Sequence, residues 1–361
     1  MKRREPLSQQ HAELPSKTAY HLTPVRGMAN EDRTTKRGAS VRCERTNPDA
    51  KNFGLKSRDM GYAGLNALKE EYKSFESIST IHDRWNVFCS WVKAEQGIKD
   101  LRKVEVSHLM QYADHLRDRF ENGEIKASTA QNYLSAVNRV MEIARGDNKV
   151  RVDPVKQGDL PKRSGISEGD KSISQERHDK ATYIATERTG ALLNLQRELG
   201  LRFEESAKLN ADKALAQAQS KGCVEIRDGT KGGRPRFVPI FEQSQIKALE
   251  HARDIQNGRS MIPAEQSYKE FRQDAYKEAA RLGVKFHGER HAYAQNRYEK
   301  LSGVKCPVKA GIKHGNAHHK YISREKGISV ETAKSLDREV RMQIARELGH
   351  GRVDVTNSYL G

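Results

Sequence analysis

Apolar residues recur at helical spacing in two blocks of this chain, and a segment with few apolar residues separates the blocks. The clearest stripe of the first block has a four-three-four spacing, which places its side chains on one face of a helix. Its residues are Ile81, Trp85, Phe88 and Val92. Three more segments have the same period: 62–75, 106–120 and 133–144. The first block therefore predicts a compact unit of four helices.

The second block predicts a mixed unit. Its helical period covers five segments: 191–199, 243–256, 265–282, 289–301 and 330–348. Two short apolar runs, 223–226 and 236–240, are typical of strands. The glycines of Asp228-Gly229-Thr230-Lys231-Gly232-Gly233 supply the positive φ angles that a hairpin needs. We therefore expect a small antiparallel sheet with Lys231 at the hairpin tip.

These patterns divide the chain into four parts, which are 1–56, 57–150, 151–180 and 181–361. The first part is rich in Lys and Arg, and its apolar residues keep no helical or strand period for more than one turn. It is therefore either a flexible arm that binds a polyanion or an inert solubilising tail. The second is the helical unit, and the third is a linker rich in Gly, Pro, Ser and charged residues. The fourth is the mixed, mainly helical domain.

The charge balance points to a polyanionic partner. Sixty-five Lys and Arg against 48 Asp and Glu give 361 residues a net charge of +17. No run approaches the roughly 18 apolar residues that a membrane-spanning helix requires. The first residues include no apolar stretch of the kind a secretory signal needs, and the four cysteines are far apart, which fits a reducing compartment. We expect a cytoplasmic protein that acts at the nucleoid and does not bind membranes.

The residues that could carry chemistry stand in the second block. The chain has no phosphate-binding glycine loop, no hydrolase elbow and no zinc-protease motif. It has instead basic and tyrosyl positions in these contexts: Gly200-Leu201-Arg202-Phe203-Glu204-Glu205, Thr230-Lys231-Gly232, His287-Gly288-Glu289-Arg290-His291, Leu348-Gly349-His350 and Tyr359. Taken singly, each is more often a surface, ion-pair or packing residue.

Taken together and in this order, these residues resemble the catalytic signature of the tyrosine recombinases, the phage-integrase family. The resemblance covers about 172–361, and the helical unit at 57–147 lies where that family has its core-binding domain. It implies a helical core-binding domain and a mixed catalytic domain closing around one DNA duplex. It also implies a site-specific recombinase that cleaves and rejoins DNA through a 3′-phosphotyrosine, and the integration or excision of a mobile element.

The roles that the resemblance implies agree with general chemistry. Arginine makes paired, charge-assisted hydrogen bonds to phosphate oxygens, which suits Arg202 and Arg290. Tyr359 would be the nucleophile, and Lys231 would protonate the departing 5′-hydroxyl. His350 would donate to a nonbridging oxygen and His287 would take the phenol proton, although the sequence leaves the division between the two histidines open.

Supporting roles fall to Glu205, which would hold the arginines in place, and to His291. The resemblance implies neither a metal ion nor ATP nor any other cofactor. The partners would be double-stranded recombination sites, a homotetramer on paired sites, and a directionality or host architectural factor. Two alternatives are a type IB topoisomerase-like enzyme that nicks and reseals one duplex, and a catalytically silent DNA-binding accessory protein.

Two features depart from the family pattern. Sixty residues separate Arg290 from His350, because the basic segment 301–329 is added between them. The histidines of this segment could share a metal with Cys306, but Gly311 and Gly315 argue against a helix there, so we expect a basic loop facing DNA. The sequence also stops two residues after Tyr359, so we expect another element to link protomers.

Overall fold

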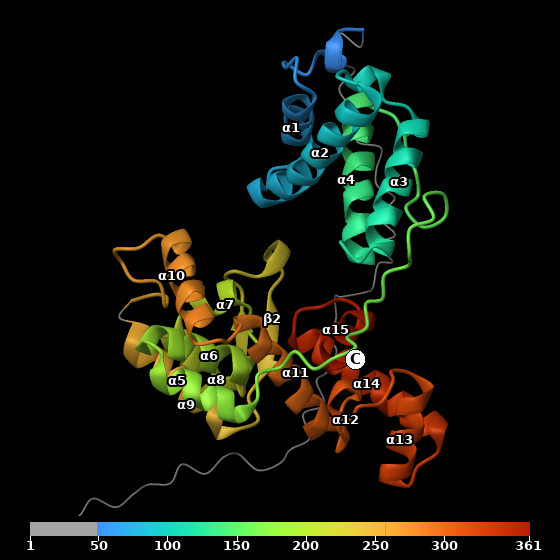
Figure 1. Cartoon of the computed structure of the whole chain (residues 1–361). Helices are drawn as coiled ribbons and strands as arrows, with labels where there is room; N and C mark the ends of the chain where they lie inside the picture. The colour runs from blue at the N-terminus through green and yellow to red at the C-terminus, as the bar shows by residue number, and fades with distance from the viewer. Residues whose placement is uncertain (1–48, 257) are drawn as a thin grey trace, which may run out of the picture. The chain divides into compact units, whose positions relative to one another are not determined.

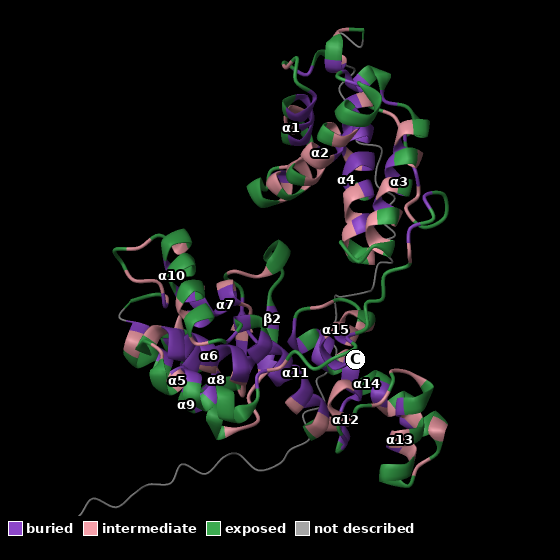
Figure 2. Ribbon diagram, in the orientation of Figure 1, coloured by how far each residue is buried: buried purple, intermediate pink, exposed green. Residues whose placement is uncertain are grey.

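The computed structural model describes residues 49–256 and 258–361, which form two units that divide between Lys162 and Arg163. Each unit has an apolar core of its own, and Figure 2 shows these buried residues in purple inside each unit. Most of the basic arm expected over 1–56, residues 1–48, lies outside the described residues. None of the helices in the described ranges combines the length and the apolar character that crossing a bilayer demands.

Four α-helices build the first unit, as the periodicity predicts (Figure 1): α1 (Met60–Glu71), α2 (Phe75–Gln96), α3 (Val106–Glu121) and α4 (Ala127–Arg145). Trp85 of α2 is fully buried, and its Nε1–H donates to the Met60 carbonyl at 3.0 Å. A Cβ at Gly64 of α1 would lie 2.2 Å from that indole nitrogen. Glycine inside a helix lowers the stability of the fold by about 0.5–1 kcal/mol, whereas burying a large apolar side chain raises it by roughly 2–3 kcal/mol. The close packing of Trp85 against Gly64 therefore stabilises the unit.

The segment expected as a linker, 151–180, is shared between the units. Val152 and Leu160 are buried in the first core, whereas Ile173 is buried in the second. Residues 163–172 have no helix or strand, and α5 (Gln175–Ile184) begins before the expected end of the linker. Its N-cap is Ser174, whose hydroxyl accepts from the Arg177 backbone N–H.

The second unit is mainly helical with one small antiparallel sheet, which confirms the predicted fold class. Its strands are β1 (Cys223–Ile226) and β2 (Arg236–Pro239), with Val224 opposite Val238. Its helices after α5 are α6 (Glu187–Leu199), α7 (Phe203–Lys208), α8 (Ala211–Lys221), α9 (Gln243–Gln256), α10 (Tyr268–Arg281), α11 (Phe286–Ser302), α12 (Pro307–Ala310), α13 (Asn316–Lys326), α14 (Val330–Glu347) and α15 (Asn357–Leu360).

The second unit contains helices that the periodicity did not predict, among them the short α7 and α15. The periodicity missed α8 because its apolar side chains are mostly alanines, which favour a helix without forming a stripe of large residues. The segment 301–329, expected as a loop, contains α12 and α13. Gly311 ends α12 at φ +67° and Gly315 precedes α13, so the two glycines mark helix ends rather than prevent helices.

Candidate active site

The guanidinium of Arg290, near the start of α11, is fully buried and is held by two backbone carbonyls. Its Nη1 donates to the Gly200 oxygen and its Nη2 donates to the Leu348 oxygen. Gly200 is the C-cap of α6 and Leu348 is the C-cap of α14. The last carbonyls of a helix lack partners inside it and carry partial negative charge, so they suit a buried cation.

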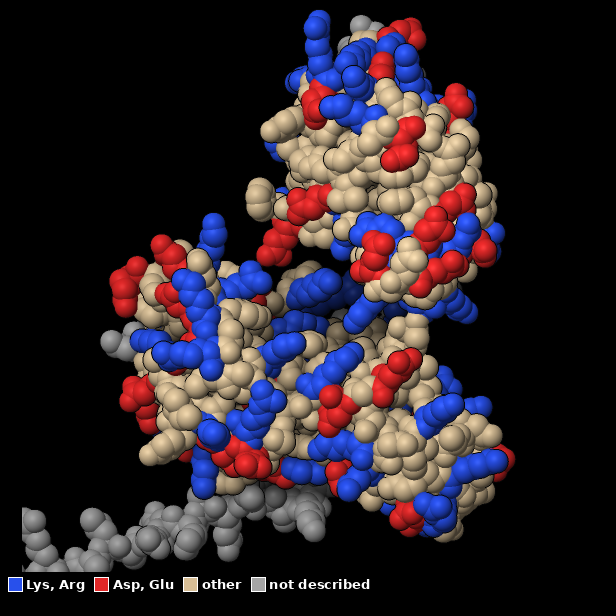
Figure 3. Space-filling model, in the orientation of Figure 1, with Lys and Arg blue, Asp and Glu red and all other residues tan. Residues whose placement is uncertain are grey.

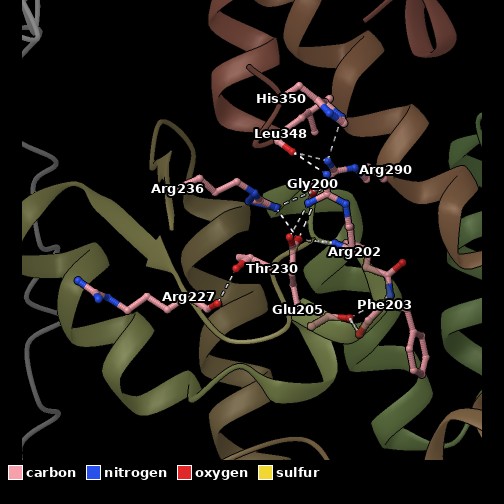
Figure 4. Close-up of polar contacts among 12 residues, drawn as sticks. Gly200, Arg202, Phe203, Glu205, Arg227, Thr230, Arg236, Arg290, Leu348 and His350 are labelled. Atoms are coloured by element: carbon pink, nitrogen blue, oxygen red, sulfur yellow. Dashed lines mark hydrogen bonds and ion pairs between the residues drawn. The ribbon is translucent and has the colours of Figure 1, made fainter. Parts of the chain in front are cut away.

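This arrangement explains why the separate motifs occur together. The Gly200 carbonyl comes two residues before Arg202, and the Leu348 carbonyl comes two residues before His350. By bonding to both carbonyls, Arg290 brings the three motifs to one point, although 58 residues separate it from Leu348 and 90 from Gly200. Figure 4 shows Arg202, Arg290 and His350 converging there.

A buried carboxylate, Glu205 on α7, lies beneath the arginines. Its Oε1 accepts from Nη1 of Arg202 at 2.7 Å, and its Oε2 accepts from the Arg202 backbone N–H at 2.7 Å. Oε2 also accepts from Nη2 of Arg236 at 2.6 Å and lies 3.8 Å from Nη1 of Arg290. Burial alone would raise the pKa of Glu205, but Arg236 and Arg290 hold it below its ordinary value. Glu205 is therefore a carboxylate shared by three arginines, consistent with the supporting role expected for it.

Arg236, the first residue of β2, is the member of this cluster that sequence reasoning missed. It is 5% exposed, and burial lowers its pKa to about 10 despite the opposing effect of Glu205. A signal for it was present, because side chains alternate along a strand and the buried Val238 lies two residues further on. A Cβ at Gly349 would lie 2.7 Å from Cδ of Arg236, so this glycine gives the arginine its room.

Tyr359 of α15 lies beside Arg290 and is 5% exposed. Nε of Arg290 donates to the phenol oxygen at 3.3 Å, and Nε2 of His350 lies 3.4 Å from the same oxygen. The rings of His287 and His291 are centred 5.6 Å and 4.8 Å from the tyrosine ring. The phenol is thus surrounded by one arginine and three histidines.

The surroundings keep these histidines neutral at physiological pH. Burial, followed by Arg290 and Arg202, lowers the pKa of His350 to about 4. Burial, followed by His287, lowers the pKa of His291 to about 4. The ring of His287 stays on the surface, yet partial desolvation and the cation Arg290 still lower its pKa. A neutral imidazole has one nitrogen free to accept a proton.

Lys231 does not join this group. It lies exposed at the start of a 3₁₀ turn, Lys231–Gly233, between β1 and β2. The turn is nevertheless anchored next to the site, since a Cβ at Gly229 would lie 2.7 Å from the Glu204 carbonyl carbon. Glycine at φ +75° permits this approach. Lys231 therefore lies two residues after Gly229, the turn residue that packs against α7, and it occupies the hairpin position expected for it.

The cysteine and histidines of 301–329 bind protein groups rather than one another. Nδ1 of His314 lies 3.0 Å from the Gly361 carbonyl oxygen, and Nε2 of His318 lies 3.0 Å from that of Lys305. Cys306 is buried, and burial raises its thiol pKa to about 11. Within residues 49–256 and 258–361, no group of three His, Cys, Asp or Glu side chains is placed to hold a metal ion.

Comparison with known proteins gives a match to one family model over part of the chain and a likeness of fold. Residues 166–296 match the family model described as Integrase, whereas no curated protein matches the chain. The XerH site-specific recombinase, bound to palindromic difH substrate in a post-cleavage complex, is 13% identical with a TM-score of 0.51, over 85% of this chain and 82% of that chain. At this identity the likeness concerns the fold.

Two further solved structures have lower TM-scores. A lambda integrase dimer bound to a COC′ core site is 13% identical with a TM-score of 0.46, over 76% of this chain and 92% of that chain. The Tn1549 transposon integrase in complex with circular intermediate DNA is 10% identical with a TM-score of 0.47, over 84% of this chain and 96% of that chain.

Proposed function

We propose that the chain is a tyrosine recombinase of the integrase family, which cleaves and rejoins DNA at specific sites through a covalent 3′-phosphotyrosine intermediate. The observation that carries the proposal is the setting of the Tyr359 hydroxyl, which lies within hydrogen-bond distance of both Arg290 and His350. A phenol between a phosphate-binding cation and a neutral imidazole has what nucleophilic attack on a phosphodiester requires.

Cleavage proceeds by one substitution at phosphorus. The phenol oxygen of Tyr359 forms a bond to phosphorus, the bond from phosphorus to the 5′-oxygen breaks, and the DNA 3′ end becomes esterified to tyrosine. The phenol proton passes to Nε2 of His350, an imidazole nitrogen that lies 3.4 Å from the phenol oxygen. Lys231, on its anchored turn, gives a proton to the departing 5′-oxygen. The new ester preserves the bond for religation, so the reaction needs no ATP and no metal ion.

The arginines bind the phosphate. Arg202 and Arg290 lie at the point where the motifs meet, and their donors stabilise charge on the nonbridging oxygens during attack. Arg202, Arg236 and Arg290 are three cations against the single carboxylate of Glu205. The remaining positive charge favours a phosphodiester anion at this place.

The wider surface suits a DNA duplex. On the visible face of the second unit, Lys and Arg side chains spread over much of the surface (Figure 3). Neutralising phosphates with such residues gives an affinity that falls steeply with salt. We propose further that four protomers assemble on two sites, with a directionality or architectural factor, to integrate or excise a mobile element. The protein would work in the cytoplasm at the nucleoid.

A nicked suicide substrate tests the proposal. Cleavage beside a nick releases a short fragment that diffuses away, so the wild-type chain should accumulate a DNA adduct that survives boiling in detergent. Tyr359→Phe should form no adduct while it binds DNA with unchanged affinity. An adduct of equal yield from Tyr359→Phe would show that another residue is the nucleophile.

A strand-exchange assay, read together with adduct formation, separates the alternatives. A recombinase exchanges strands between two labelled duplexes that carry the site, whereas a topoisomerase-like enzyme only relaxes one supercoiled duplex. A silent accessory protein binds DNA and forms no adduct with any substrate. Strand exchange by the wild-type chain is the expected result.

A further inference from the structure

The helix that carries Tyr359 has only four residues, Asn357–Leu360. A helix this short is not stable by itself in water, because fixing the backbone of the first turn loses more free energy than its one hydrogen bond gains. The position of the nucleophile must therefore be set by contacts from elsewhere in the chain. These contacts come from α11, whose Gln295 Nε2 donates to the Tyr359 backbone oxygen at 3.2 Å, and from α14, Ser167 and the 301–329 segment.

One side chain of α14, Arg341, bonds to the Tyr359 segment on both sides of the nucleophile. Its Nη1 donates to the Asn357 side-chain oxygen at 3.0 Å, and its Nη2 donates to the Gly361 backbone oxygen at 2.9 Å. Asn357 and Gly361 lie two residues before and two residues after Tyr359. A planar guanidinium that bonds at both points restricts the rotation of the segment between them.

Arg341 is itself firmly held. It is 2% exposed, and its Nε donates to both oxygens of Asp337, one helical turn earlier, at 3.0 Å and 2.9 Å. The hydroxyl of Tyr298 donates to the same carboxylate. Burial alone would raise the pKa of Asp337, but Arg341 and Tyr298 hold it below its ordinary value. The guanidinium therefore has a fixed orientation before DNA binds.

The 301–329 segment completes the support of Gly361. Nδ1 of His314 lies 3.0 Å from the Gly361 oxygen, and a Cβ on Gly361 would lie 2.7 Å from Cγ1 of Val308. At the other end, the Ser167 backbone N–H donates to the Asn357 backbone oxygen at 2.9 Å. The added segment thus packs against the residues that flank the nucleophile.

We infer that Arg341 is a positioning residue for Tyr359, which holds the phenol in line with a phosphate bound by Arg202 and Arg290 of the same chain. The inference rests on the proposed function. Displacing a reacting group by about 1 Å can slow a reaction roughly 100-fold, so loss of one of the two contacts should be measurable in the chemical step.

Asn357→Ala tests the inference without disturbing the buried pair of Arg341 and Asp337. It removes one acceptor of Arg341, and the rate of adduct formation at saturating nicked DNA should fall about 10- to 100-fold with DNA affinity unchanged. Asn357→Asp keeps an acceptor for Arg341 and should retain most of the wild-type rate. Arg341→Ala should lose more than Asn357→Ala, and Arg338→Ala, an exposed arginine of the same helix, should behave as wild type.

A substrate with a 5′-bridging sulfur at the scissile phosphate distinguishes positioning from other defects. A thiolate leaves without needing a proton, so this substrate should rescue Lys231→Ala but not Asn357→Ala. If Asn357→Ala and Arg341→Ala, both folded by circular dichroism, form adduct at the wild-type rate, the inference is wrong. If the wild-type chain itself forms no adduct on either substrate, it is the proposed function that fails.

Discussion

The Arg236 guanidinium lies 2.6 Å from the Glu205 carboxylate, and both side chains are buried. The carboxylate faces two further arginines, Arg202 and Arg290, so it acts as the common anion of a cationic cluster. Nε and Nη1 of Arg236 have no hydrogen-bond partner within the described ranges. A strand residue thereby helps to fix the carboxylate that orients Arg202, and both arginines bind the same carboxylate that Arg290 approaches.

Arg236→Ala should lower the free energy of unfolding by about 3 kcal/mol, because it removes one partner of a buried ion pair. Arg227→Ala, which breaks an exposed pair with Glu225 beside the same hairpin, should change it by no more than about 0.5 kcal/mol. Urea unfolding of both variants at pH 7 measures the difference. Equal effects of the two substitutions would mean that the buried pair does not stabilise the fold.

Lys231→Ala should slow adduct formation on ordinary nicked DNA by about 10²- to 10⁴-fold, the usual contribution of a general acid. It should leave protein stability and DNA affinity almost unchanged, because the side chain is exposed on its turn. A 5′-bridging sulfur should restore the rate, since a thiolate needs no proton. Lack of rescue would assign the leaving-group proton to another residue.

The stability of the protein should fall as the pH is lowered from about 6.5 towards 4. The pKa values of His350 and His291 are lowered to about 4 in the folded chain, whereas an unfolded histidine titrates near 6.5. Between about pH 4 and pH 6.5 the unfolded chain binds more protons than the folded chain, so protonation favours unfolding. Above about pH 6.5 the contribution of these neutral histidines to stability is fully present. Urea unfolding at several pH values should show a smaller slope for His350→Asn than for wild type. Identical slopes would contradict the lowered pKa of His350.

Cleavage should occur in cis, because Tyr359 packs against Arg290 of its own chain. Mixing Tyr359→Phe with Arg202→Ala should then restore no adduct, since neither protomer has both the nucleophile and the complete phosphate site. The measurement is adduct yield on nicked DNA with the two variants mixed in equal amounts. Recovery of substantial adduct would mean that the tyrosine crosses to a neighbouring protomer.

Much of the fold could be predicted from local pattern. The stripe containing Trp85 and Phe88 is buried in α2 as the helical spacing predicts, and the two apolar runs around the glycine turn pair as β1 and β2. The prediction failed where the pattern is weak, at the alanine-rich α8 and at the glycine-containing segment of α12 and α13. At those places intrinsic propensity and tertiary packing decide, and neither produces a period of large apolar residues.

Some residues of the candidate site could be predicted from local sequence, and others could not. The order and context of Arg202, Arg290, His350 and Tyr359 are local facts, so the sequence by itself determined the chemistry to expect and the residues that would carry it. The alternation with Val238 was a signal for Arg236 that the prediction did not use, whereas no signal pointed to Arg341, because an arginine in a helix is ordinarily exposed. Only the tertiary structure decided that these two cations are buried, since their carboxylate and carbonyl partners come together only when distant helices pack.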